Sequence, residues 1–375
     1  MKCSAALLWE QPGKWDICEV ELDPPKSQEV LIRMEAAGLC HSDDHLAQGE
    51  VPLARFPVCA GHEGAGVVEA VGSNVTRLKV GDHVVTTFIP SCGRCRWCAS
   101  GMTALCENGA VLFDGLQFDG TFRMHAQGHD VGQISMISTF SEWTVVPEVS
   151  AIKIAGDVPF TSACVVGCAV PTGWGSAINA GEVVPGDVVI VIGVGGVGSN
   201  ALQGARAGGA SHIIAVDTSP TNRHRAPIFG ATQAVSTIAE AADIARNLTN
   251  GQGADVVIVC VGINTGAITG EALNAIRKAG TLVVTGVGDA RQDALIPANL
   301  LVLPLFGKRI HGTIYGGTSP AKDIPRLVEL YRNGQLLLDE LVTKTYSLDQ
   351  INEAYDDMRA GLNIRGVITF DHHRA

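Results

Sequence analysis

The chain has 375 residues, of which 46% are hydrophobic and 17% are charged, and its formal net charge is −11. This composition argues against extensive disorder and supplies enough apolar residues for two domains. The negative charge disfavours nucleic acid and anionic membrane surfaces as partners. In addition, no apolar run approaches the roughly 20 residues of a membrane span.

The beginning of the chain bears on its location. The first ten residues carry one lysine and an apolar stretch too short for a signal peptide. Several of the eleven cysteines stand near histidines at spacings typical of metal sites, which favours reduced thiols and a cytoplasmic protein.

Up to about residue 150 the sequence consists of short β-branched segments punctuated by glycine. Strands are predicted at 29–34, 66–71 and 82–86, each bounded by turn residues. We expect these strands to form an antiparallel, barrel-like arrangement whose loops carry the chemistry.

From about residue 187 the pattern changes to strand, helix, strand. Continuous apolar runs at 188–192, 213–216, 256–259 and 282–284 are typical of parallel strands buried on both faces, and a helix is predicted at 266–279. This pattern predicts an α/β fold with a doubly wound parallel sheet.

The last sixty or so residues depart from this alternation again. An amphipathic helix is predicted at 324–333 and a returning strand at 363–370. We interpret them as completing the first domain, so the nucleotide domain is an insertion. The predicted division is 1–170, 171–313 and 314–375.

A glycine loop follows the first predicted parallel strand and opens a helix. Its glycines permit a tight turn, close approach of a pyrophosphate and close helix packing. The loop consists of Gly193, Val194, Gly195, Gly196, Val197 and Gly198.

Asp217 ends the second parallel strand, where a carboxylate would accept a hydrogen bond from an adenosine ribose hydroxyl. A 2′-phosphate would be repelled there, so NAD is favoured over NADP. Arg223 and Arg225 lie just beyond and would soften that preference.

Four cysteines stand close together in a loop at about 91–107, namely Cys92, Cys95, Cys98 and Cys106. Four thiolates satisfy a tetrahedral Zn²⁺ and leave no position for substrate, so the predicted role is structural. A zinc ribbon that binds nucleic acid is the alternative, and the acidic charge counts against it.

A second set of metal-type residues, Cys40, His62 and Cys168, is spread along the chain. Two sulfurs and one imidazole leave the fourth tetrahedral position for water or an alcohol oxygen, which is the arrangement of catalytic zinc. One closed zinc, one open zinc and a dinucleotide site together indicate an alcohol-type dehydrogenase with two Zn²⁺ per chain.

The segment Gly-His-Glu-Gly-Ala-Gly at 61–66, with Gly72 and Val75 after it, resembles the zinc signature of the medium-chain alcohol dehydrogenases. The four-cysteine loop, the glycine loop with Asp217, and Ile364-Arg365 match the same family, and the resemblance runs essentially end to end. It implies a Rossmann domain inserted in a mostly β, GroES-like catalytic domain. It also implies reversible, NAD-linked oxidation of an alcohol to an aldehyde or ketone.

The resemblance assigns roles around the open zinc site. Cys40, His62 and Cys168 correspond to the catalytic zinc ligands, and Glu63 to an acid that approaches the metal during ligand exchange. Three further residues complete the arrangement: Asp43 orients the His62 imidazole, Ser42 bonds the substrate oxygen, and His45 is the outer end of a proton relay.

The resemblance also assigns cofactor and substrate contacts. His41 and Arg365 correspond to positions that contact the pyrophosphate, and Thr172 to one beside the nicotinamide. The positions that line the alcohol pocket are apolar, which favours a primary or hydrophobic alcohol over a polyol; they are Phe88, Val111, Ile134, Val287 and Ile314. Val287 also falls among the predicted cofactor contacts.

Some features leave alternatives open. His41 replaces a common Arg, which would speed cofactor release, and Asn222 with Arg223 alters the turn after Asp217. The segments 139–143 and 363–366 resemble a bacterial subgroup in which some members hold NAD(H) permanently and use an external acceptor.

Two further functions compete with these. Formaldehyde dehydrogenases of the resembled family that act on a thiol adduct carry a basic residue shortly after the fourth structural cysteine, and 107–110 has none, which disfavours that function. A zinc-stabilised nucleotide sensor would require the open metal site to be idle. In the resembled family, shortened versions of the segment between Cys106 and Phe140 accompany tetramers. The long segment here therefore implies a homodimer, through edge pairing of nucleotide-domain sheets. Five cysteines are expected only as buried apolar thiols: Cys3, Cys18, Cys59, Cys164 and Cys260.

Overall fold

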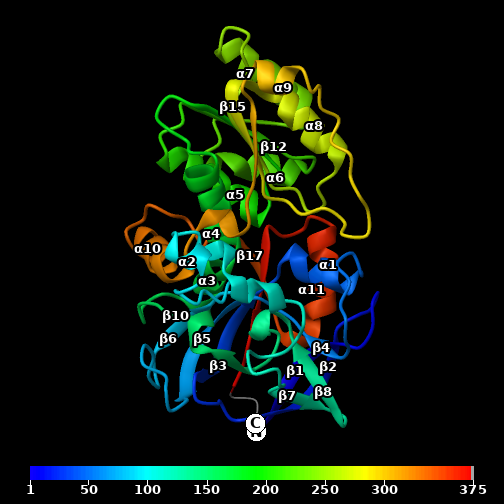
Figure 1. Cartoon of the computed structure of the whole chain (residues 1–375), viewed down its shortest axis with the longest axis vertical. Coiled ribbons are helices and arrows are strands. Elements are labelled where there is room, and N and C mark those ends of the chain that lie inside the picture. Colours follow the sequence, from blue (N-terminus) through cyan, green and yellow to red (C-terminus); the bar gives the residue numbers. More distant parts are fainter. Residues whose placement is uncertain (373–375) are drawn as a thin grey trace. The chain divides into compact units, whose positions relative to one another are not determined.

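The computed structural model describes residues 1–372, and its elements are labelled in Figure 1. The chain divides into two compact units. Unit 1 comprises Met1–Cys168 and the segment from Ser319 onward, whereas unit 2 comprises Ala169–Thr318. The chain therefore leaves unit 1 directly after Cys168 and returns to it at Ser319.

Unit 1 contains a small closed barrel of five strands in the order β1-β2-β7-β8-β4. Neighbouring strands are antiparallel except for β4 and β8, which run parallel. Alternating apolar residues fill its core, as the burial pattern of β2 shows. The strands are β1 (Lys2–Leu8), β2 (Asp16–Leu22), β4 (Val58–Cys59), β7 (Met124–Ala126) and β8 (His129–Gln133).

A seven-stranded sheet forms the second layer of unit 1, in the order β10-β6-β5-β3-β18-β17 with β9 paired to β3. Strand β18 from the end of the chain pairs antiparallel with β3, so the tail completes this sheet. The strands are β3 (Glu29–Gly38), β5 (Glu63–Val71), β6 (His83–Thr86), β9 (Trp143–Pro147), β10 (Ala151–Lys153), β17 (Val342–Tyr346) and β18 (Arg365–Thr369).

The predicted barrel-like, mostly β arrangement of unit 1 is confirmed. The antiparallel pairing expected up to about residue 150 is wrong for β4 and β8, which pair in parallel. Strands β17 and β18 of the tail, for which no direction was predicted, are parallel as well. Each of these pairs joins segments that are distant in sequence or separated by a helix, whereas short turns impose antiparallel pairing.

Short helices connect the strands of unit 1. Helices α1 and α11 lie side by side at one end of this unit (Figure 1), where Arg359 of α11 pairs with Asp44 of α1. The helices are α1 (His41–Ala47), α2 (Arg96–Ala99), α3 (Phe160–Ala163), α10 (Pro320–Arg332) and α11 (Ile351–Arg359). Single 3₁₀ turns are η1 (Thr103–Leu105), η2 (Glu107–Val111), η3 (Ile134–Met136), η4 (Glu148–Ser150), η5 (Cys164–Gly167) and η9 (Leu348–Gln350).

Unit 2 is a six-stranded sheet in the order β13-β12-β11-β14-β15-β16, and every neighbouring pair is parallel. The order reverses at β11, whose five residues are all buried, and this is the predicted doubly wound topology. The strands are β11 (Val188–Ile192), β12 (His212–Val216), β13 (Gln233–Val235), β14 (Ala254–Val259), β15 (Ile276–Val284) and β16 (Arg309–Gly312).

Helices join the strands of unit 2 as a parallel sheet requires. They are α4 (Ala169–Gly175), α5 (Gly196–Ala207), α6 (Pro220–Arg225), α7 (Ile238–Leu248), α8 (Gly266–Ala275) and α9 (Val302–Leu305). Single turns are the π-helical η6 (Ser176–Ala180) and the 3₁₀ turns η7 (Ala226–Phe229) and η8 (Tyr315–Gly317).

The helix predicted at 266–279 is too long. Helix α8 ends at Ala275, and β15 begins at the next residue. Here Ile276 pairs with Ala254 of β14, and the Arg277 guanidinium forms an ion pair with Asp255. These contacts with the neighbouring strand outweigh the helical propensity of the segment.

The tail elements lie close to their predicted places. The predicted helix 324–333 corresponds to the second part of α10, which ends at Arg332 with Asn333 as its C-cap. Helix α10 begins earlier than predicted, at Pro320, where the missing N–H of proline costs no hydrogen bond. Strand β18 is shorter than the predicted 363–370. Among residues 1–372, no helix has the length and apolar character needed to cross a membrane.

Candidate metal centres and nucleotide site

Four residues of unit 1 gather where its central strands meet the neighbouring loops. Cys40 follows β3 and precedes α1, His62 and Glu63 stand at the start of β5, and Cys168 follows the turn η5. One ligand atom from each lies within 4.8 Å of the others, and all four residues are buried. The structure thus brings together residues that the sequence holds far apart.

The titratable groups of this cluster have pKa values shifted in different directions. A hydrogen bond from Cys168 keeps the pKa of Cys40 well below the ordinary thiol value, and the same bond raises the pKa of Cys168. Burial opposes charge on His62, but the Asp43 carboxylate and the Cys40 sulfur raise its pKa well above the ordinary value. A divalent cation would take the place of these protons, and two sulfurs with an imidazole are donors that fit zinc.

Asp43 fixes the orientation of the His62 ring. Its carboxylate is 1% exposed and lies 3.0 Å and 3.2 Å from His62 Nδ1 through Oδ2 and Oδ1. The Gly61 N–H also donates to Asp43 Oδ1 at 3.0 Å. With Nδ1–H directed at the carboxylate, His62 Nε2 carries the lone pair for a metal, as the predicted role of Asp43 requires.

Glu63 is compensated by a buried guanidinium. Arg365 Nη2 lies 2.8 Å from Glu63 Oε1, and Arg365 Nη1 donates to the Leu39 carbonyl at 2.8 Å. Burial alone would lower the pKa of Arg365, but Glu63 and the two sulfurs raise it. Both residues carry predicted roles, but their pairing is not evident from the sequence. Contact of Arg365 with a pyrophosphate stays a prediction.

Helix α1 carries the predicted relay residues. His41 and Ser42 are exposed in its first turn, and Ser42 Oγ lies 3.7 Å from Cys40 Sγ. His45, in the last turn, is buried, and its Nδ1 lies 2.5 Å from Glu50 Oε2. Glu50 was not predicted, because it lies beyond the end of α1 and belongs to no motif.

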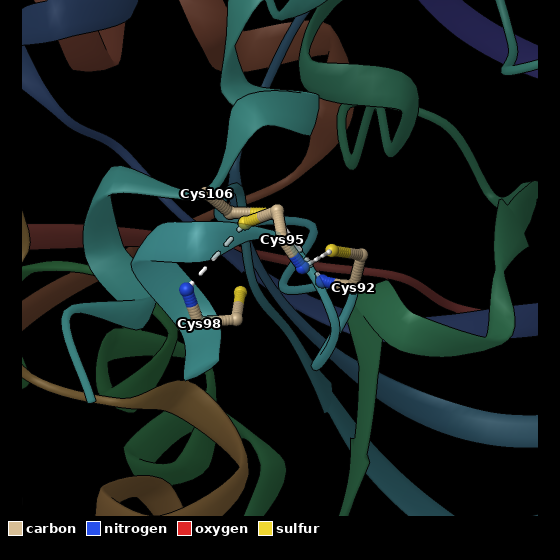
Figure 2. Close-up of side chains that lie close together, drawn as sticks. All are labelled: Cys92, Cys95, Cys98 and Cys106. Carbon is tan, nitrogen blue, oxygen red and sulfur yellow. Dashed lines mark hydrogen bonds between the residues drawn. The ribbon is translucent and has the colours of Figure 1, made fainter. Parts of the chain in front are cut away.

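The four cysteines of the 91–107 loop converge in space, and Figure 2 shows their side chains turned toward a common point. Backbone N–H groups donate to sulfurs within the loop: Cys95 N to Cys92 Sγ at 3.3 Å and Cys98 N to Cys95 Sγ at 3.4 Å. Cys92 N donates to Cys106 Sγ at 3.3 Å. Such donors stabilise thiolates, so the loop fits a closed four-sulfur metal site.

The electrostatics of these sulfurs also suit a cation. The N–H of Cys98 lowers the pKa of Cys95 to about 6, whereas burial raises the pKa of Cys98 to about 12. Four negative sulfurs this close together repel one another, and a divalent cation removes that repulsion.

The glycine loop of unit 2 has the geometry expected of a dinucleotide turn. Gly193 adopts φ +83°, and a Cβ at Gly198 would lie 1.8 Å from the Gly193 carbonyl oxygen. Helix α5 begins at Gly196 and therefore presents its N-terminal amides at this turn. Val197 is half-buried in its first turn.

Asp217 is held at the end of β12 by three donors. The N–H of Val194 and the Asn222 amide donate to Oδ2 at 2.8 Å and 3.1 Å, and the Ser219 N–H donates to Oδ1 at 2.8 Å. Arg223 Nη1 donates to the Asp217 carbonyl at 2.7 Å. The carboxylate is therefore fixed beside the glycine loop.

The predicted pocket residues are not all placed alike. Phe88 lies edge-on to the His62 ring, with centroids 5.5 Å apart, and Val111 is half-buried at the end of η2. Ile134 is 3% exposed and packs in the apolar core of unit 1. Val287 and Ile314 are exposed residues of unit 2.

Thr172 and the cysteines without a predicted role lie elsewhere in the two units. Thr172 lies in α4 of unit 2, where its carbonyl accepts from Ser176 Oγ at 2.7 Å. The cysteines without a predicted role are buried thiols with one partly exposed exception, Cys260; the others are Cys3, Cys18, Cys59 and Cys164.

Comparison with known proteins agrees with this architecture. Residues 26–156 match the alcohol dehydrogenase GroES-like domain, and residues 196–333 match the zinc-binding dehydrogenase domain. Putative alcohol dehydrogenase D of Mycobacterium tuberculosis is 47% identical over 374 residues, covering 98% of this chain and all of that protein. The chain belongs to the zinc-containing medium-chain alcohol dehydrogenases.

Two further similarities within this family are informative. The NDMA-dependent alcohol dehydrogenase of Amycolatopsis methanolica is 47% identical over 98% of this chain and 99% of its own length. The benzyl alcohol dehydrogenase of Acinetobacter calcoaceticus has a similar structure, with a TM-score of 0.90 and 31% identity over 99% of this chain and 100% of that chain. The protein is thus an oxidoreductase of the alcohol dehydrogenase type.

The glycine loop provides a matched pair of substitutions. Gly198→Ala should lower the free energy of unfolding by about 1–3 kcal/mol, because the new methyl group meets the Gly193 carbonyl. Gly195→Ala should leave the melting temperature unchanged, because nothing lies within 4 Å of its Cβ position. It should nevertheless weaken NADH binding about tenfold, or ~1.4 kcal/mol, by obstructing the pyrophosphate.

Thermal unfolding and NADH titration by fluorescence measure both effects. Equal loss of stability in the two variants would contradict the assigned packing of Gly198. Unchanged NADH binding by Gly195→Ala would contradict the placement of the pyrophosphate.

Proposed function

We propose that the protein reversibly oxidises a primary or other hydrophobic alcohol to its aldehyde or ketone, with NAD and a catalytic zinc held by Cys40, His62 and Cys168. The buried cluster supports this most strongly, because its fourth member, Glu63, is paired with Arg365, so that two sulfurs and an imidazole would leave one position for a substrate oxygen. When bound, zinc would supply Lewis-acid polarisation of that oxygen, and NAD would accept the hydride.

The residues of the chain would hold and move the proton that the alcohol loses. Ser42 Oγ, near Cys40 Sγ, would accept the hydroxyl proton from the substrate while passing its own proton onward. His45 would receive the proton at the far end of the relay and release it to solvent. Asp43 keeps His62 in the tautomer that leaves Nε2 available as a ligand.

NAD is proposed rather than NADP. The Asp217 carboxylate is held in one orientation by the Val194 N–H and the Asn222 amide. A 2′-phosphate would therefore be repelled by a carboxylate that cannot rotate out of its way. Arg223, which could have offset this repulsion, donates to the carbonyls of Asp217 and Thr218.

A small aromatic or aliphatic alcohol is the proposed substrate class. Phe88 presents an apolar ring beside His62, and the similar solved structure of a benzyl alcohol dehydrogenase points the same way. A thiol-adduct substrate is less favoured, because η2 after the fourth cysteine carries Glu107 and no basic residue.

A nicotinoprotein is the second candidate, with NAD(H) held throughout the cycle and re-oxidised by another substrate. It is favoured by the 47% identity to an NDMA-dependent alcohol dehydrogenase. Under this alternative the zinc ligands and relay residues keep the same roles.

We also propose a homodimer in which two copies pair through β16 at the edge of the unit 2 sheet. All four residues of β16 are exposed. The preceding segment exposes large apolar side chains that a second copy would cover, among them Leu295 at 90%, Leu300 at 78% and Leu301 at 69%. An exposed edge strand beside an apolar patch is a common pairing surface.

Metal analysis separates the two proposed zinc sites. Wild-type protein should contain two zinc ions per chain, while Cys40→Ser and Cys95→Ser should each contain about one. Cys40→Ser should remain folded and lose alcohol oxidation, whereas Cys95→Ser should unfold at a lower temperature. Elemental analysis, thermal unfolding and NADH formation from benzyl alcohol provide the measurements. Alcohol oxidation retained by Cys40→Ser would refute the catalytic assignment.

The state of the cofactor decides between the two candidate functions. If NAD exchanges freely, protein after gel filtration should lack NADH absorbance and should turn over added NAD⁺. A nicotinoprotein should retain that absorbance and oxidise alcohol only when an acceptor such as NDMA is added.

The dimer is tested by Leu301→Lys, which places a charge on the exposed apolar segment before β16. Light scattering after gel filtration should give twice the chain mass for wild type and a single chain mass for the variant. Leu362→Lys is a matched control, because Leu362 is also 69% exposed but lies in unit 1. A monomeric wild type would disprove the proposal.

A further inference from the structure

Glu50 is an acidic residue next to the predicted relay, and no motif accounts for it. Its Oε2 lies 2.5 Å from His45 Nδ1, and the two side chains are only 20% and 8% exposed. In the part of the chain that the structure describes, the Glu50 carboxylate forms its hydrogen bond with His45. The pair is therefore a short, largely buried hydrogen bond between a carboxylate and an imidazole.

The backbone holds this pair in place. The N–H groups of Glu50 and Val51 donate to the His45 carbonyl at 2.9 Å and 3.4 Å, so the chain turns back toward the histidine directly after α1. The Gln11 amide donates to the carbonyls of Leu46 and Val51, and the N–H of Leu53 returns a hydrogen bond to Gln11 Oε1 at 2.9 Å. Hydrogen bonds to the His45 carbonyl and to the Gln11 side chain therefore stabilise the turn that carries Glu50.

Asp44, the neighbouring acidic residue, cannot take over this function. It forms an ion pair with Arg359 of α11, so its charge is already compensated. The Glu50 carboxylate, by contrast, is directed at the imidazole ring. A carboxylate that accepts from Nδ1–H fixes the tautomer in which Nε2 carries the lone pair.

We propose that Glu50 is a positioning residue for the proton relay, and this inference rests on the proposed function. Glu50 holds the His45 proton on Nδ1, so that Nε2 is the atom that accepts the proton passed on from the alcohol. The imidazole then carries one positive charge beside the carboxylate until Nε2 releases its proton to water. No electrons are transferred in this step, and each proton received is released.

The test is single-turnover oxidation of benzyl alcohol by the NAD-loaded protein, followed by the absorbance of NADH. Rates are measured in H₂O and D₂O, and with ordinary and α,α-dideuterated alcohol. Glu50→Gln should slow the reaction at least about tenfold, because loss of the group that fixes an imidazole tautomer is costly. The solvent isotope effect should rise and the substrate isotope effect should fall, because proton transfer becomes limiting. Glu50→Asp should recover part of the rate.

Asp130→Asn is the matched control. It removes the carboxylate from another histidine pair, in which His125 Nδ1 lies 2.8 Å from Asp130 Oδ1 on the exposed barrel surface. Its rate and both isotope effects should equal those of the wild type. Isotope effects are ratios and do not depend on the active fraction, so a partly unfolded Glu50 variant still gives a decisive result.

The outcomes separate the inference from the proposed function. If His45→Gln is slow but Glu50→Gln matches the wild type in rate and isotope effects, the role of Glu50 is refuted and the proposed function stands. A slower Glu50→Gln with unchanged isotope effects would also refute it, since a purely structural defect gives that pattern. If Cys40→Ser still oxidises the alcohol, the proposed function itself fails.

Discussion

The ion pair between Glu63 and Arg365 is the interaction on which the centre of unit 1 depends. Both side chains are almost fully inaccessible, and an uncompensated charge there would cost several kcal/mol. The partners are brought together by the sheet, because Glu63 begins β5, Gly38 of β3 stands opposite it, and β18 pairs with β3. A Cβ at Gly38 would lie 2.3 Å from Glu63 Oε2, so a side chain at this position would displace the Glu63 carboxylate.

The same ion pair influences the electrostatics of the cluster that contains Cys40, His62 and Cys168. The positive charge of Arg365 helps to lower the pKa of Cys40, and the sulfurs in turn raise the pKa of Arg365. Arg365 alone cannot balance Glu63 and two thiolates, which agrees with the hydrogen bond between Cys168 and Cys40 that lowers the pKa of Cys40. A divalent cation completes the charge balance, which couples metal binding to the stability of the sheet that carries the ligands.

The sequence predicted features that depend on local spacing or on a recognisable family pattern. Local spacing predicted the four-cysteine loop, the glycine loop and the apolar parallel strands. The family pattern predicted the cluster of Cys40, His62 and Cys168, because these residues are scattered along the chain. Features decided by tertiary contacts could not be predicted from the sequence. The start of β15 at Ile276 depends on pairing with β14, and the pairing of Arg365 with Glu63 depends on the register of the sheet. Glu50 escaped because a residue beyond a helix end has no periodicity that would direct it toward His45.

The two clusters of metal-type residues differ in what their assembly requires. The cysteines of the 91–107 loop lie within one short segment, so a cation can draw them together with little loss of chain entropy. Cys40, His62 and Cys168 come from three distant segments, and they are brought together by the pairing of β3 with β5 and by the turn η5 that precedes Cys168. This cluster is therefore a product of the completed fold. The positions of these side chains are set by the sheet, as the proposed vacant coordination position for a substrate would require.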